Sequence, residues 1–189
     1  MIDDWLKAVV ATPGLTALRG DDARRVLVDD SLAGMELVRQ FDGPIVDVGS
    51  GGGAPGIPLA HSLPEREFTL LEANGRKCDF LRRWAPANAS VVQGRAEEQQ
   101  ADRFGVALAK ALAPPPVAAE WCLPLVYAGG AAILWVGPSA DRDHIARVAA
   151  QLAAEPVAAP PGFAVLQKLA PTPPGFPRRT GVARKRPLA

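Results

Sequence analysis

The chain has 189 residues, 48% hydrophobic and 22% charged, which is an ordinary composition for a globular protein. This length suits a single α/β domain over residues 1–189, and the longest apolar run, residues 131–137, is far too short to span a membrane. The N-terminal sequence carries aspartates and lacks the basic region of a signal peptide, so we expect a cytoplasmic protein with no membrane segment.

The elements expected along the chain alternate between strands and helices. After an N-terminal segment, residues 1–42, short β-branched runs predict strands, and apolar residues at helical spacing predict helices. Glycines 129 and 130 favour a helix that ends there, and the Pro/Ala-rich stretch 153–162 is typical of a loop or linker. The predicted strands are 44–50, 67–73, 90–94, 104–111, 131–137 and 163–170, and the predicted helices are 74–85, 122–130 and 141–154. This alternation predicts a doubly wound, mostly parallel sheet with helices on both faces.

Four glycines within five residues mark the turn after the first strand, in the sequence VDVGSGGGAPGIPLA at residues 46–60. Such a cluster costs backbone entropy, so a ligand that lies against the backbone is the expected compensation. A strand-to-helix turn with this glycine spacing is typical of nucleotide-binding units. The turn alone fits both nicotinamide dinucleotides and S-adenosylmethionine. Its candidate ligand-binding residues are Asp47, Gly49, Gly51, Gly53 and Ala54.

Three features favour S-adenosylmethionine. Glu72 ends the second strand, where a carboxylate can accept hydrogen bonds from ribose hydroxyls. Ala96 and Glu97 follow the third strand, where a backbone N–H and a carboxylate suit an adenine edge, although Glu97 or Glu98 also fits a solvated helix start. The chain also lacks a substantial second domain, which a hydride-transferring enzyme normally needs for its substrate. The cofactor prediction is therefore S-adenosylmethionine.

Lys110 ends the fourth strand, at the edge where open α/β sheets bind their ligands. A cation there is costly to bury unless it is paired, so we expect it to hold a phosphate or the donor's carboxylate. The alternative is a side chain that extends from the strand end into water. His61 and His144 have no evident partner in the sequence, and Cys78 and Cys122 lack metal-ligand spacing. We therefore predict small core cysteines, structural histidines and no metal site.

The last 19 residues, 171–189, hold five basic residues and no acidic one, which leaves a net charge of −4 on the rest of the chain. A basic tail on a mildly acidic body is typical of contact with a polyanion such as RNA, although a solvated tail has the same composition. The candidate RNA-binding residues are Arg178, Arg179, Arg184, Lys185 and Arg186.

These motifs together resemble one family. The glycine turn, LLEANGRKCDFLR at residues 70–82, GRAEE at 94–98 and the ending PRRTGVARKRPL are similar to the bacterial 16S ribosomal RNA guanine-N7 methyltransferases, also called the glucose-inhibited division protein B family. The resemblance implies a Rossmann-like methyltransferase fold and ribosomal RNA or the small ribosomal subunit as partner; we expect a monomer. It also implies a shortened or divergent member, because the N-terminal segment is shorter than usual and Lys110 stands where arginine is typical.

Methylation at guanine N7 suits a chain without a catalytic constellation. That nitrogen has an in-plane lone pair and no proton at neutral pH, so no general base is needed and alignment of the reactants supplies the catalysis. No catalytic residue is therefore predicted. The alternatives are a methyltransferase of the same fold that acts on a small molecule or a protein, and a donor- or RNA-binding module without turnover; a nicotinamide-dependent oxidoreductase is the most distant.

Overall fold

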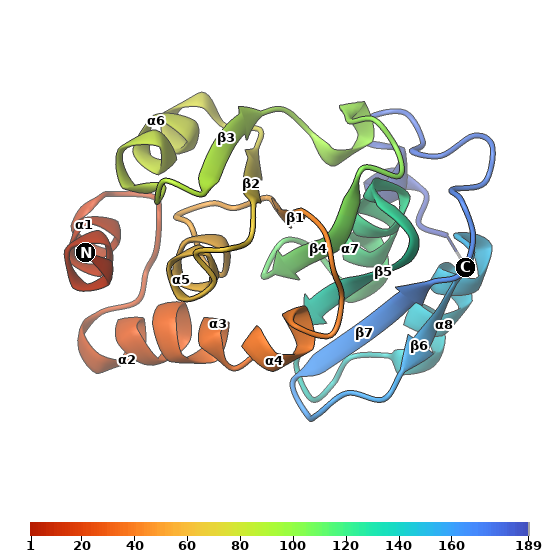
Figure 1. The fold of residues 1–189 in the computed structure, drawn as a ribbon, viewed down its shortest axis with the longest axis horizontal. Coiled ribbons are helices and arrows are strands. Elements are labelled where there is room, and N and C mark those ends of the chain that lie inside the picture. Colours follow the sequence, from red (N-terminus) through yellow and green to blue (C-terminus); the bar gives the residue numbers. More distant parts are fainter. Residues whose placement is uncertain (189) are drawn as a thin grey trace.

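The computed structural model describes residues 1–188, which form one seven-stranded sheet in the order β3-β2-β1-β4-β5-β7-β6 (Figure 1). Neighbouring strands from β3 to β5 pair in parallel, whereas β7 pairs antiparallel with both β5 and β6. The expected mostly parallel sheet is therefore confirmed. The strands are β1 (Ile45–Val48), β2 (Phe68–Glu72), β3 (Ala89–Gln93), β4 (Phe104–Lys110), β5 (Val126–Trp135), β6 (Ala154–Val157) and β7 (Phe163–Lys168).

Helices cover both faces of the sheet. Side chains of α1, α5 and α6 share one apolar cluster, α4 and α5 contribute to a second, and α7 and α8 pack in a third on the opposite face. No helix within residues 1–188 is long and apolar enough to cross a membrane. The helices are α1 (Ile2–Ala11), α2 (Gly20–Arg24), a π-helical turn η1 (Arg25–Asp29), α3 (Asp30–Leu32), α4 (Met35–Val38), α5 (Gly56–Ser62), α6 (Gly75–Trp84), η2 (Ala96–Glu98), α7 (Pro115–Cys122), η3 (Leu123–Leu125), α8 (Arg142–Gln151) and α9 (Val182–Lys185).

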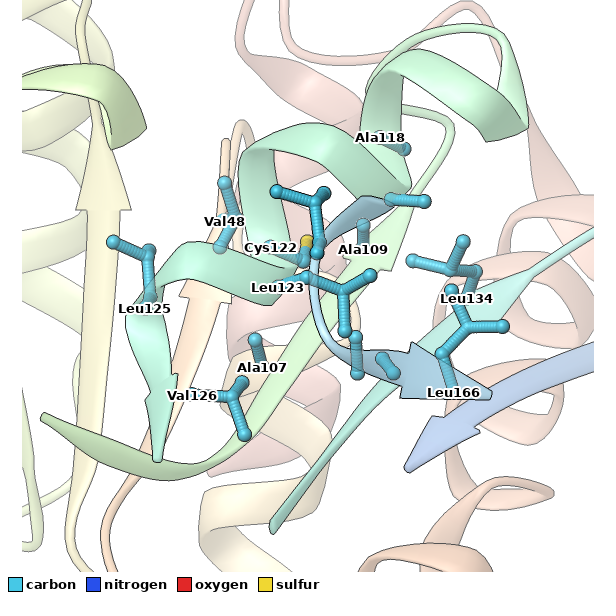
Figure 2. Close-up of a cluster of buried hydrophobic side chains, with 14 of the residues drawn as sticks. Val48, Ala107, Ala109, Ala118, Cys122, Leu123, Leu125, Val126, Leu134 and Leu166 are labelled. Atoms are coloured by element: carbon cyan, nitrogen blue, oxygen red, sulfur yellow. The ribbon is translucent and has the colours of Figure 1, made fainter. Parts of the chain in front are cut away.

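The largest apolar cluster of the described residues lies between the sheet and the helix pair α7–α8. Figure 2 shows part of it, with Ala118 and Cys122 of α7 near strand residues such as Ala109. Cys122 lies within it, fully buried beside Leu123 and Val126, which confirms a core role for that cysteine. β1 and most of β4 are buried because both sheet faces are covered, as their continuous apolar sequences predict. This buried centre fixes the positions of the strand ends where ligands bind.

Two sequence interpretations are wrong. Residues 126–130, assigned to a helix, are the first half of β5, because α7 ends at Cys122 and the glycine pair lies inside the strand. The stretch interpreted as a loop contains the edge strand β6, where Pro156 is tolerated because an edge strand leaves one side of its backbone unpaired. In addition, the N-terminal segment, for which no element was assigned, is largely helical.

Candidate functional site

A cavity of about 570 Å³ opens at the carboxyl ends of β1, β2 and β4. Its volume falls within the range of small-molecule sites, roughly 300–1,000 Å³. The glycine turn, the end of β2 and residues 94–97 form its inner half, while the N-terminal segment and Arg184 border it from outside. Most of the predicted donor-binding residues line this one cavity: Gly49, Gly51, Ala54, Glu72, Ala96, Glu97 and Lys110.

Gly51 leaves the space against which a ligand can lie. It has φ +57°, and a Cβ at this position would meet no atom nearer than the Gly49 carbonyl oxygen at 3.8 Å. Gly49, with φ +70°, is needed for a different reason, because a Cβ there would clash with Leu112. Glycine adopts such backbone angles most readily, because it has no Cβ. The turn therefore presents bare backbone to the cavity at Gly51.

Glu72 holds the glycine turn in place. Its Oε2 accepts a hydrogen bond from the Gly51 N–H at 2.9 Å, and its Oε1 accepts one from the Asn74 N–H at 2.8 Å. The residue is largely buried at the cavity wall. An ionised carboxylate offers about four acceptor positions, so capacity remains for the hydroxyl groups of a ligand. Glu72 thus both shapes the turn and faces the cavity.

Asp47 and Gly53, also predicted to bind the donor, are not among the lining residues. The Asp47 carboxylate is buried and accepts a hydrogen bond from the Gly56 N–H at 3.1 Å, at the start of α5. Burial raises the pKa of Asp47 to about 7. A Cβ on Gly53 would come within 2.5 Å of Ile57 and 3.1 Å of the Trp5 indole nitrogen. Both residues therefore shape the turn from behind.

Helix α1 supplies a wall that the sequence analysis missed. The indole N–H of buried Trp5 donates to the Gly52 carbonyl at 2.9 Å, and a Cβ on Gly52 would lie 3.3 Å from Val9. The signal in the sequence is the spacing of Trp5 and Val9, four residues apart on one helical face. The lining residues contributed by the N-terminal segment are Trp5, Val9, Leu15, Thr16, Leu18, Val26 and Leu27.

Lys110 connects the sheet to this N-terminal wall. Its Nζ donates to the Val26 carbonyl at 2.6 Å and forms an ion pair with the Asp30 carboxylate at 3.1 Å. The Lys110 side chain is only 10% exposed, so its cation is paired where it is buried. The side chain borders the cavity but uses its charge on residues of this chain rather than extending into water.

The basic C-terminal segment, residues 171–188, folds back onto the rim of the cavity. The Gly181 N–H donates to Glu97 Oε1 at 3.0 Å, and the Thr180 hydroxyl donates to Glu98 Oε1 at 3.2 Å. Arg178 forms a bidentate ion pair with buried Glu120, with both hydrogen bonds at 2.6 Å. Arg178 therefore has a structural partner within the chain, and its contact with RNA stays a prediction. The exposed basic residues of the segment are Arg179, Arg184, Lys185 and Arg186.

The two cysteines and His144 contact other parts of the chain. Cys78 and Cys122 are buried, and the Cys78 thiol donates to the Glu72 carbonyl at 3.2 Å. Burial raises the pKa of both thiols. His144 Nε2 lies 3.1 Å from the Leu188 carbonyl. Within residues 1–188 no group of three or more His, Cys, Asp or Glu side chains has an arrangement that would hold a metal ion.

Solved structures with this architecture define the class of fold. The 16S rRNA N2 G1207 methyltransferase of T. thermophilus, solved with AdoMet and guanosine, superimposes with a TM-score of 0.55 at 16% identity, covering 74% of this chain and 40% of that one. A SAM-dependent O-methyltransferase from Thermotoga maritima gives 0.58 at 13% identity, covering 77% and 66%. The fold is that of Rossmann-like methyltransferases.

Sequence relatives identify the family within that class. The profile of the family described as rRNA small subunit methyltransferase G matches residues 12–157. The ribosomal RNA small subunit methyltransferase G of Synechococcus elongatus is 36% identical over 84% of this chain and 75% of that protein. The protein of that name from Rubrobacter xylanophilus is 37% identical over 77% and 65%. The chain belongs to the rRNA small subunit methyltransferase G family, which confirms the predicted family of S-adenosylmethionine-dependent methyltransferases.

Proposed function

We propose that this protein transfers a methyl group from S-adenosylmethionine to N7 of a guanine in 16S ribosomal RNA, acting as a cytoplasmic monomer on the small ribosomal subunit. The observation that carries this proposal is the bare backbone at Gly51, which faces a cavity bordered by the Glu72 carboxylate. Family membership supplies the class of reaction and supports ribosomal RNA as the substrate.

The residues of the cavity fit the donor. Gly51 leaves room for its methionine part, and Glu72 has free acceptor positions for ribose hydroxyls. The backbone of Ala96 and the carboxylate of Glu97 border the cavity where an adenine edge would lie. When bound, the donor supplies an electrophilic methyl group on a sulfonium. The protein binds it, orients it and limits its contact with water.

The acceptor nitrogen needs no activation by this chain. Guanine N7 carries no proton at neutral pH, and the described residues that line the cavity include no histidine or cysteine. Alignment alone is a strong source of rate, because effective molarities in well-oriented systems reach roughly 10⁵–10⁸ M. Inner and outer walls that fix the reactants are therefore sufficient for this chemistry.

The exposed cations of the C-terminal segment are suited to bind the RNA. Arg179, Arg184, Lys185 and Arg186 are exposed on a segment that is bonded to the cavity rim through Gly181. A cluster of cations next to the donor cavity would hold the phosphate backbone of the substrate close to the methyl group.

Mass spectrometry of 16S ribosomal RNA tests the proposal, in cells with the gene, without it, and complemented with the Gly51→Val variant. We expect one 7-methylguanosine to disappear on deletion and to return only with the wild-type gene. An unchanged nucleoside inventory on deletion would contradict ribosomal RNA as the substrate. Return of the methyl group with Gly51→Val would contradict the proposed donor site.

A further inference from the structure

A second hollow lies beside the donor cavity, past the ends of β4 and β5. It has a volume of about 580 Å³, and its wall begins at residues 114–117, just after Leu112 of the donor cavity. Arg184 borders both hollows, so the two adjoin at this residue. The carboxyl ends of parallel strands are where open α/β sheets bind ligands. This hollow has no role in the donor site described above.

Contacts from several elements hold the walls of the second hollow in place. The bidentate pair between Arg178 and Glu120 anchors the C-terminal segment to α7, and Ala183 of α9 is buried. At the far end, His144 of α8 contacts the Leu188 carbonyl at 3.1 Å. Arg184 and Pro187 are therefore carried on a segment fixed at both ends.

The lining has the chemistry of a nucleotide site. Prolines 114–116, Val117 and Ala140 give an apolar surface of the kind that packs against a base. Asp141 contributes a carboxylate whose Oδ1 caps α8 by accepting from the His144 N–H at 2.9 Å, which leaves Oδ2 for a ligand. A guanine presents N–H donors at N1 and N2, for which a carboxylate is the matching acceptor. Arg184 supplies a cation suited to phosphate.

We propose that the second hollow binds the acceptor guanine nucleotide of the RNA, with Asp141 accepting from its N1 and N2 N–H groups and Arg184 contacting its phosphate. This inference rests on the proposed function and names the site where the acceptor base is held. Base and donor then occupy neighbouring hollows that share Arg184 at their border, and N7 has to reach the methyl group past one edge of that side chain.

Filling the hollow is the first test. Gly137 lines it, is exposed, has no left-handed φ, and a Cβ there meets no atom within 4 Å. Gly137→Trp therefore adds bulk without backbone strain. We expect KM for small subunits that lack the methyl group to rise at least tenfold, with S-adenosylhomocysteine affinity within about twofold of wild type. Gly137→Ala should raise KM much less. A wild-type KM in Gly137→Trp would overturn the inference while leaving the proposed function standing.

The second test measures recognition of the base without turnover. Guanosine 5′-monophosphate and adenosine 5′-monophosphate are titrated by NMR into protein saturated with S-adenosylhomocysteine. We expect a preference for the guanine nucleotide that Asp141→Asn reduces about tenfold, since asparagine still caps the helix but offers one fewer acceptor. Asp143→Asn, an exposed neighbour on α8 outside the hollow, is the matched control.

The two tests separate the inference from the function on which it rests. If wild type does not methylate RNA but binds the guanine nucleotide in a manner that Gly137→Trp and Asp141→Asn abolish, the proposed function fails and the guanine site stands. If the wild type methylates RNA and guanine nucleotide binding is unchanged in Gly137→Trp and Asp141→Asn, the proposed function stands and the guanine site is overturned.

Discussion

The inner and outer halves of the donor cavity are held by different interactions. The inner half is the glycine turn and the end of β2, where the ladder pairs Val48 with Leu71 and Glu72 binds the Gly51 N–H. The outer half consists of the N-terminal and C-terminal segments, attached by side-chain contacts such as Lys110 with Asp30 and Gly181 with Glu97. The inner half is thus fixed by the sheet, whereas the outer half combines apolar packing of α1 against α5 and α6 with a few bonds that single substitutions can remove.

The largest expected effect is at the inner half. Gly51→Val places a branched side chain in the ligand's space at a residue with φ +57°, so we expect donor binding to fall at least a hundredfold. Calorimetry with S-adenosylhomocysteine measures the affinity, and circular dichroism checks that the fold persists. Gly75→Ala, where a Cβ lies 3.4 Å from Gln93, is the control for loss of a glycine. Normal affinity in folded Gly51→Val would remove the turn from the site.

Glu72→Gln tests whether the inner half needs a charge as well as space. The substitution keeps the size but replaces one acceptor oxygen with an amide group, and hydrogen bonds to charged groups are worth about 1.5–3 kcal/mol. Donor affinity should fall about ten- to a hundredfold, measured by the same calorimetry. Glu67→Gln, an exposed carboxylate just before β2, should bind like wild type. An unchanged dissociation constant in Glu72→Gln would place the ribose elsewhere.

The exposed cations test the outer half against RNA. Replacing Arg179, Arg184, Lys185 and Arg186 with glutamine leaves the structural pair of Arg178 and Glu120 in place, whereas truncation would remove it. Each phosphate contact contributes roughly −0.7 to −0.9 to the slope of log affinity against log salt. If three cations make contact, the slope becomes shallower by about 2 to 3. Binding to 16S ribosomal RNA across a salt series measures it. Equal slopes for the wild type and the variant with four glutamines would favour a substrate other than RNA, either a small molecule or a protein.

Lys110 tests whether the outer half is held as the contacts indicate. Lys110→Met removes the bonds to Val26 and Asp30, so we expect faster protease cleavage within the N-terminal segment and a donor affinity about five- to tenfold lower. Lys110→Arg should retain most of the protease resistance and most of the donor affinity. Asp29→Asn, at an exposed neighbour of Asp30, should change neither the cleavage rate nor the affinity. Weakened donor binding without faster cleavage would instead assign Lys110 to direct contact with the donor.

The last expected effect is on stability rather than on binding, through buried Asp47 behind the turn. Its pKa of about 7 in the folded protein lies above the ordinary 3.8, so the native state holds a proton that the unfolded state has lost. The contribution of Asp47 to the free energy of unfolding therefore falls as pH rises from about 4 to about 7, by about 1.4 kcal/mol per pH unit at most. Asp47→Asn should remove this decline in urea titrations across that range. If the unfolding free energy of Asp47→Asn depended on pH in the same way as that of the wild type, a protonated Asp47 carboxyl in the folded protein would be contradicted.

The sequence predicts the inner half of the cavity far better than the outer half. The glycine turn and Glu72 are signalled locally, because β-branched runs and backbone angles restrict the residues that fit there. The roles of Lys110 and Arg178 depend on partners distant in the sequence, Asp30 and Glu120, which no local pattern indicates. The first half of β5 was missed for a similar reason, because Val126 begins the strand by pairing with Phe104 of β4, a partner distant in the sequence.

Hydrogen exchange with and without S-adenosylhomocysteine tests the central claim most directly, namely that one ligand contacts both halves of the cavity. We expect increased protection at the backbone amides of residues 49–54, 72–74 and 95–97, and also in α1 and residues 180–185, which the ligand would tie to the inner half. Protection confined to the inner half would contradict an outer wall that closes on the donor. Protection confined to β5–β7 would contradict the site itself.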